Sequence, residues 1–150
     1  MGGFAAIKKT AEYTYIKNVA AFASFNFGYV GKLFDIIPGA KEMALEKLSV
    51  GSMLLNTTGE ELLKDIINHY PDWDLVDIAP KMKDKNLLLI GAMHDHLAPG
   101  NMHHQPLAVA FRKNKNIAFS EHLLDTGHSF SDKRIRLTSL LIEWLNKITF

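Results

Sequence analysis

The chain of 150 residues contains no cysteine, so disulfide bonds, thiolate nucleophiles and cysteine-based metal sites are excluded. Long apolar runs are also absent, since none approaches the roughly 20 residues that a membrane-spanning helix needs. The apolar segment VAAFASF (residues 19–25) is too short for a signal peptide and lacks a suitably placed cleavage site. We therefore expect a protein without a membrane partner, and the missing cysteines favour a cytoplasmic location.

An excess of one charge sign is missing too. Lysine and arginine number 17, aspartate and glutamate 16, and the formal net charge is +1. The densest basic stretches, residues 81–85 and 112–115, are short and typical of solvated helix ends or loops. A nucleic-acid partner is therefore not expected. With 47% hydrophobic and 22% charged residues, the composition is that of a globular protein, and a chain of this length can form one domain with a core.

Helical spacing of apolar residues predicts several helices. A short amphipathic helix over residues 2–11 stands at the very start of the chain, and another helix is predicted over residues 41–48. A third follows two overlapping capping boxes in TTGEE (residues 57–61), and we expect Pro71 to end it.

Three apolar runs alternate with helical segments and are predicted to be strands: residues 18–25, 86–92 and 116–124. The second is apolar throughout, as in a strand buried on both faces, whereas the third is more polar and is expected nearer a sheet edge. A helix is predicted over residues 102–112, and a last one, capped by Ser129 or Ser131, leads to IEWL. This alternation predicts the α/β class, with a parallel sheet and crossover helices.

Two polar loops follow the second and third predicted strands, MHDHLAPG (residues 93–100) and LLDTGHSF (residues 123–130). Such loops lie at one edge of a parallel sheet, where functional sites are found. They carry Asp95 and His128, and a carboxylate held against an imidazole orients that base to activate a hydroxyl nucleophile. We expect an Asp95 oxygen within hydrogen-bond reach of a His128 ring nitrogen, with Asp125 as the reserve acid.

The histidines allow a second interpretation, because imidazole is a common metal ligand. A metallohydrolase would need a fuller set of ligands at regular spacing, such as H-E-x-x-H, and the sequence has none. The simpler interpretation places His94 and His96 beside the acid in its loop, and His103 and His104 at the start of a helix. We expect no metal and no other cofactor.

The segments around these loops resemble the C-terminal half of an α/β-hydrolase. GAMHDHLAP has the glycine, aspartate and proline typical of that family's acid loop, and DTGHSFSDKRI resembles its histidine loop. The family orders its triad nucleophile, acid, histidine, so the resemblance implies that Asp95 is the acid and His128 the base. It also implies a single partial α/β-hydrolase domain over residues 1–150, with a helical cap insertion over about residues 32–80.

The opening MGG resembles the end of the family's nucleophile elbow G-x-S-x-G, often written GHSMGG. The resemblance then implies a nucleophilic serine immediately before Met1, with the backbone N–H of Met1 as one oxyanion-hole donor. None of the seven serines of the chain lies in a G-x-S-x-G setting, and Ser52, in GSM, comes nearest.

The resemblance therefore implies the C-terminal portion of a serine hydrolase that cleaves an ester, thioester or amide bond in a small molecule or peptide. The alternative is a non-catalytic fragment or interaction module that has the same fold. Without the family's first strands, the strand at residues 18–25 would have an unpaired edge, so self-association is expected.

Overall fold

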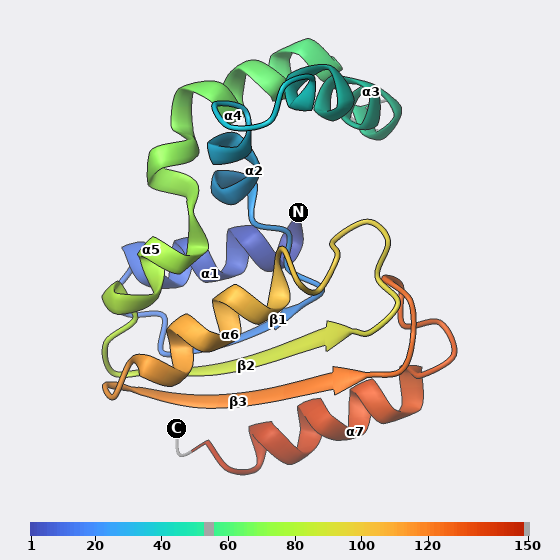
Figure 1. The fold of residues 1–150 in the computed structure, drawn as a ribbon. Coiled ribbons are helices and arrows are strands. Elements are labelled where there is room, and N and C mark those ends of the chain that lie inside the picture. The colour runs from blue at the N-terminus through green and yellow to red at the C-terminus, as the bar shows by residue number, and fades with distance from the viewer. Residues whose placement is uncertain (53–55, 149–150) are drawn as a thin grey trace. The chain divides into compact units, whose positions relative to one another are not determined.

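The computed structural model describes residues 1–52 and 56–148. Its elements, in chain order, are α1 (Gly2–Glu12), β1 (Asn18–Phe22), α2 (Phe27–Leu33), α3 (Ala40–Ser52), α4 (Gly59–Trp73), α5 (Leu75–Ile78), the short 3-10 helix η1 (Ala79–Lys81), β2 (Lys85–Ala92), α6 (His104–Lys113), β3 (Ile117–Leu124) and α7 (Arg134–Leu145) (Figure 1). They form two compact units, which we call the sheet unit (Met1–Phe25 with Leu75–Phe150) and the helical unit (Asn26–Asp74).

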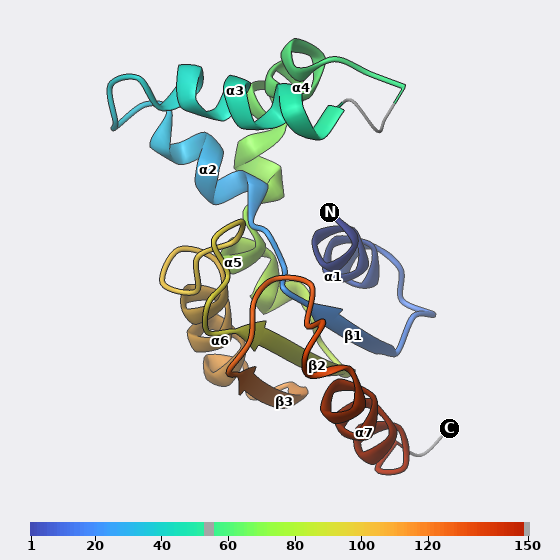
Figure 2. The same ribbon diagram turned by 90° about the vertical axis from the view of Figure 1, so that its right-hand side faces the viewer.

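The sheet unit contains a three-stranded parallel sheet in the order β1-β2-β3. Its register pairs Leu88 of β2 with Ala20 on one side and with Ser120 on the other. Helices α1 and α6 cover one face of the sheet and α7 covers the opposite face (Figure 2). The α/β class with a parallel sheet and crossover helices, predicted from the sequence, is confirmed.

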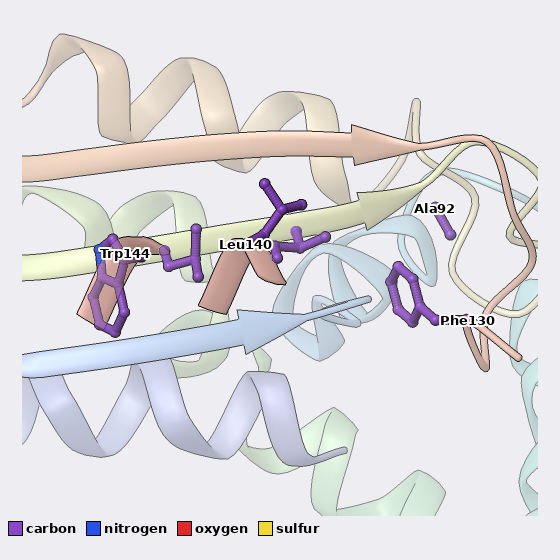
Figure 3. Close-up of a cluster of buried hydrophobic side chains, with 6 residues drawn as sticks. Ala92, Phe130, Leu140 and Trp144 are labelled. Atoms are coloured by element: carbon purple, nitrogen blue, oxygen red, sulfur yellow. The ribbon is translucent and has the colours of Figure 1, made fainter. Parts of the chain in front are cut away.

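The core of the sheet unit is organised around β2. Its even-numbered residues, Leu88 and Ile90, pack with Phe130 and with Leu140 and Trp144 of α7 (Figure 3). Because successive strand side chains point to opposite faces, Leu87 and Leu89 lie on the other face, and they are fully buried as well. The unbroken apolar run of β2 thus reflects burial on both faces, as expected for a central parallel strand.

The helical unit consists of α2, α3 and α4. Of the two overlapping capping boxes, only one forms, between Thr58 and Glu61: the Glu61 backbone N–H donates to Thr58 Oγ1 at 3.2 Å, and the Thr58 N–H donates to Glu61 Oε2 at 3.1 Å. The Thr57 hydroxyl donates a hydrogen bond to the same Glu61 carboxylate at 2.8 Å. This hydrogen bond and the Thr58 N–H lower the pKa of Glu61.

The residues that were expected to end α4 and to cap α7 do not do so. Pro71 does not end α4, which continues to Trp73 and stops where Asp74 becomes extended. The proline removes one backbone donor, and the chain tolerates that loss one turn from the helix end. Neither Ser129 nor Ser131 caps α7, which begins after Lys133 without a side-chain cap. The two serine hydroxyls instead bond to each other at 2.8 Å.

Helix α6 begins at His104, two residues later than predicted. Pro106 is its third residue, where the backbone N–H has no partner inside the helix, so the proline fits without cost. Among the described helices, none combines the length and the hydropathy that crossing a bilayer requires.

Candidate active site

The carboxyl ends of β2 and β3 place two loops side by side at one edge of the sheet (Figure 1). Backbone hydrogen bonds join the loops directly after the strands: the Met93 N–H donates to the Leu124 carbonyl at 2.8 Å, and the His94 N–H donates to the Thr126 carbonyl at 3.0 Å. The first loop, residues 93–103, carries Asp95, and the second, residues 125–133, carries His128. We call them the acid loop and the histidine loop.

Asp95 and His128 meet across these loops. Asp95 Oδ2 lies 2.8 Å from His128 Nδ1, so the predicted hydrogen bond is confirmed. The Asp95 side chain is 2% exposed and that of His128 is 39% exposed. The carboxylate is therefore buried behind an imidazole that still reaches the surface.

Asp95 is oriented by its own loop. Its Oδ1 accepts the backbone N–H groups of Leu97 at 3.0 Å and of Ala98 at 2.7 Å, so the carboxylate accepts three hydrogen bonds in all. A carboxylate only accepts, and His128 Nδ1 must then carry the proton. In this tautomer Nε2 holds a free lone pair, and no described residue hydrogen-bonds to it. His128 can therefore accept a proton at Nε2 while Asp95 stabilises the charge that forms.

The turn around His128 is closed by short-range contacts. The Phe130 N–H donates to the Gly127 carbonyl at 3.0 Å, and the Thr126 hydroxyl bonds to the Asp132 carboxylate. This hydroxyl lowers the pKa of Asp132. Phe130 adopts a left-handed backbone conformation (φ 53°), and its buried side chain belongs to the core cluster, so the turn is anchored in the core.

A second histidine–aspartate pair joins the same loops. His94 Nε2 lies 2.7 Å from Asp125 Oδ1, and both side chains are well exposed. Asp125, the reserve acid, thus pairs with His94 and not with His128. Among the described residues, two histidine–aspartate pairs join these loops, and of the two only that of Asp95 and His128 has a buried carboxylate.

Two further groups near this edge had no distinguishing signal in the sequence. His103 lies at the start of a helix, as predicted, but it is also 2% exposed and stacks on Phe25, with ring centroids 4.2 Å apart. Burial lowers the pKa of His103 to about 4, and the charge of Asp95 opposes this effect. The other group is Ser24, 5% exposed, whose hydroxyl has no hydrogen-bond partner among the described residues.

His104 has a different environment from His103. Its Nε2 lies 2.9 Å from Glu121 Oε1, and Glu121 also pairs with Arg112. These contacts link both ends of α6 to β3, which indicates a structural role. Within the described part of the chain, no three histidine, aspartate or glutamate side chains gather as a metal-binding group.

The remaining predicted site residue, Met1, directly precedes α1, and its carbonyl accepts the Ala5 N–H at 3.1 Å. Its assignment as an oxyanion-hole donor stays a prediction. No described serine hydroxyl is hydrogen-bonded to His128. Ser52, the serine whose sequence setting comes nearest to G-x-S-x-G, instead donates to the Ser49 carbonyl at 3.0 Å within the helical unit. Its hydroxyl is therefore hydrogen-bonded inside its own helix.

Comparison with solved structures identifies the fold. An enol-lactonase from Burkholderia xenovorans matches 98% of this chain with a TM-score of 0.56 and 19% identity, and the match covers 63% of the enol-lactonase. An α/β-hydrolase enzyme from a Medee basin deep-sea metagenome library matches 99% of this chain with a TM-score of 0.56 and 16% identity, over 63% of its own length. A hydrolase from Pseudomonas aeruginosa matches 95% with a TM-score of 0.53 and 12% identity, over 61% of its length.

This chain therefore has part of the α/β-hydrolase fold, and it spans less than two thirds of the length of these neighbours. At such identities the likeness shows the fold alone. No protein-family model and no curated protein matches the sequence.

Proposed function

We propose that the chain is the acid- and base-bearing portion of a serine hydrolase that cleaves an ester, thioester or amide bond. The observation that carries this proposal is the 2.8 Å hydrogen bond between the buried Asp95 carboxylate and the partly exposed His128 ring. It leaves Nε2 of His128 free to accept a proton from a nucleophile.

In the proposed reaction His128 Nε2 removes the proton of a serine hydroxyl as the serine oxygen bonds to the carbonyl carbon of the substrate. His128 then gives this proton to the leaving group, whose bond to that carbon breaks, and an acyl-enzyme remains. In the second half His128 takes a proton from water as the water oxygen bonds to the acyl carbon. The bond between that carbon and the serine oxygen then breaks, the acid is released, and His128 returns the proton to the serine oxygen. Asp95 stays ionised throughout and holds the ring in the productive tautomer.

The nucleophile proposed for this reaction is a serine directly before Met1 in a longer protein, because the opening MGG resembles the end of a nucleophile elbow. The Met1 backbone N–H would then be one oxyanion-hole donor, a contribution worth about 3 to 4 kcal/mol in the transition state. The proposed substrates are small esters, thioesters, amides or peptides, and the helical unit is proposed to be the cap insertion. A cytoplasmic location stays a prediction.

The test is ester turnover by the protein expressed from its full reading frame, with a serine before Met1. Asp95→Asn should lower kcat by about four orders of magnitude, because an amide no longer fixes the Nδ1–H tautomer. Asp125→Asn is the matched control, since it alters an equivalent but exposed pair in the same loops. Equal losses of kcat in both variants would contradict the proposal, because they would show that turnover depends on any contact between the two loops and not on Asp95 in particular.

The second candidate is a non-catalytic module that has this fold. It is favoured by the absence of any hydroxyl hydrogen-bonded to His128 among the described residues. A reading frame with no serine-bearing segment joined to Met1 would support this candidate against the hydrolase.

A further inference from the structure

The acid loop, residues 93–103, carries Asp95 near its start and ends at the buried residue His103. Asp95 Oδ1 closes the first part of the loop through the N–H groups of Leu97 and Ala98. The Pro99 carbonyl closes the second part, because it accepts the N–H groups of Met102 at 2.9 Å and His103 at 3.0 Å. The backbone of the loop thus sets the direction of the Asp95 carboxylate. The position of the loop in turn depends on the contacts made at its other end, at residue 103.

The His103 ring lies at that end of the loop and contacts another segment. It stacks on Phe25, with an interplanar angle of 29° and a centroid separation of 4.2 Å. Phe25 follows β1, so the stack joins the loop after β2 to the chain leaving β1. Stacked aromatic rings stabilise a contact beyond the area that they bury.

The His103 ring is also uncharged near neutral pH, because its burial lowers its pKa to about 4. A charged imidazolium in this position would attract the Asp95 carboxylate in competition with His128. An uncharged ring leaves Asp95 Oδ2 to His128 Nδ1.

We propose that His103 is a positioning residue for the Asp95–His128 pair: its ring, stacked on Phe25, holds the acid loop against the end of β1, so that the Asp95 carboxylate faces His128. The catalytic consequence of this role rests on the proposed function. The geometric consequence concerns the described chain alone and can be measured without turnover.

The test follows the Nδ1–H proton of His128 by NMR in the 150-residue chain, assigned by its loss in His128→Ala. A hydrogen bond to a carboxylate moves this resonance downfield and slows its exchange with water. His103→Phe keeps the stack and cannot be charged, so the resonance should persist. His103→Leu fills the space without stacking, and the resonance should broaden or weaken several-fold while circular dichroism shows a folded chain. His69→Ala is the matched control, because it removes a histidine stacked on Trp73 in the helical unit.

A folded His103→Leu variant with an unchanged resonance would overturn the inference, as would a folded His103→Phe variant that has lost it. If His103→Leu does not fold, Phe25→Leu removes the same stack from the other side and should weaken the resonance in the same way. An unchanged resonance in that variant would also overturn the inference. Absence of ester turnover in the serine-bearing protein would refute the proposed function and would leave these results unaffected.

Discussion

Lowering the pH from 7 to 4 should destabilise the sheet unit through His103. In the unfolded chain this imidazole titrates near its ordinary value of 6.5, whereas burial lowers the folded-state pKa to about 4. Between these two values the unfolded chain binds a proton that the folded chain does not. The stabilising contribution is therefore complete above pH 6.5 and is lost as the pH falls toward 4.

The size of the effect follows from these two pKa values. A tenfold change in proton affinity is worth about 1.4 kcal/mol, so His103 accounts for about 2 kcal/mol between pH 7 and pH 5 and for about 3 kcal/mol by pH 4. The acidic groups with lowered pKa values, Glu12, Glu61 and Asp132, lose their contributions at lower pH, because carboxyl groups titrate near 4 in the unfolded chain. The change in the free energy of unfolding between pH 7 and pH 5 therefore separates the contribution of His103 from those of these carboxyl groups.

The assay is urea unfolding at a series of pH values, followed by far-UV circular dichroism. The free energy of unfolding of the wild type minus that of His103→Phe should fall by about 2 kcal/mol from pH 7 to pH 5, because the variant lacks this proton-binding group. His96→Gln alters an exposed histidine in the same loop. Its free energy of unfolding should change with pH as that of the wild type does. A difference between wild type and His103→Phe that does not change with pH would refute the reasoning.

Three further predictions concern stability and association. Ser24→Ala should raise the free energy of unfolding by about 1 kcal/mol, since it removes a buried hydroxyl without a described partner; destabilisation in urea would show that the hydroxyl is satisfied. Leu140→Ala should cost about 2 to 5 kcal/mol because Leu140 is 1% exposed in the core cluster, whereas Ile135→Ala, at an exposed position of the same helix, should cost little; equal thermal shifts would contradict this account of the core. The 150-residue chain should form concentration-dependent oligomers through the edge of β1 that pairs with no described strand, and sedimentation as a monomer at all concentrations would contradict that.

The fold was predictable where periodicity and burial coincide. The apolar run of β2 has no polar alternation because helices cover both faces, and the spacing of α1 reflects one buried face with Phe4 and Ile7. Boundaries were less predictable, because a local signal can be outweighed by packing. Pro71 is the clearest case, since its effect on one hydrogen bond does not stop α4.

The candidate site was predictable to the extent that topology determines it. Parallel strands bring the loops after β2 and β3 to one edge, and Asp95 and His128 then meet there. The environment of His103 could not be predicted, because its stacking partner Phe25 is 78 positions away in the sequence and no periodic pattern links the two. The pairing of Asp125 with His94 likewise depends on side-chain directions that the sequence does not encode locally.

The central claim is that His128 acts as the base of a hydrolase whose nucleophile lies outside these 150 residues. It is tested most directly by comparing ester turnover by the serine-bearing protein, its His128→Ala variant and the 150-residue chain. The account predicts turnover by the first, a loss of at least about a thousandfold in the second, and none above background in the third. Undiminished turnover in His128→Ala, or turnover by the 150-residue chain that depends on His128, would contradict it.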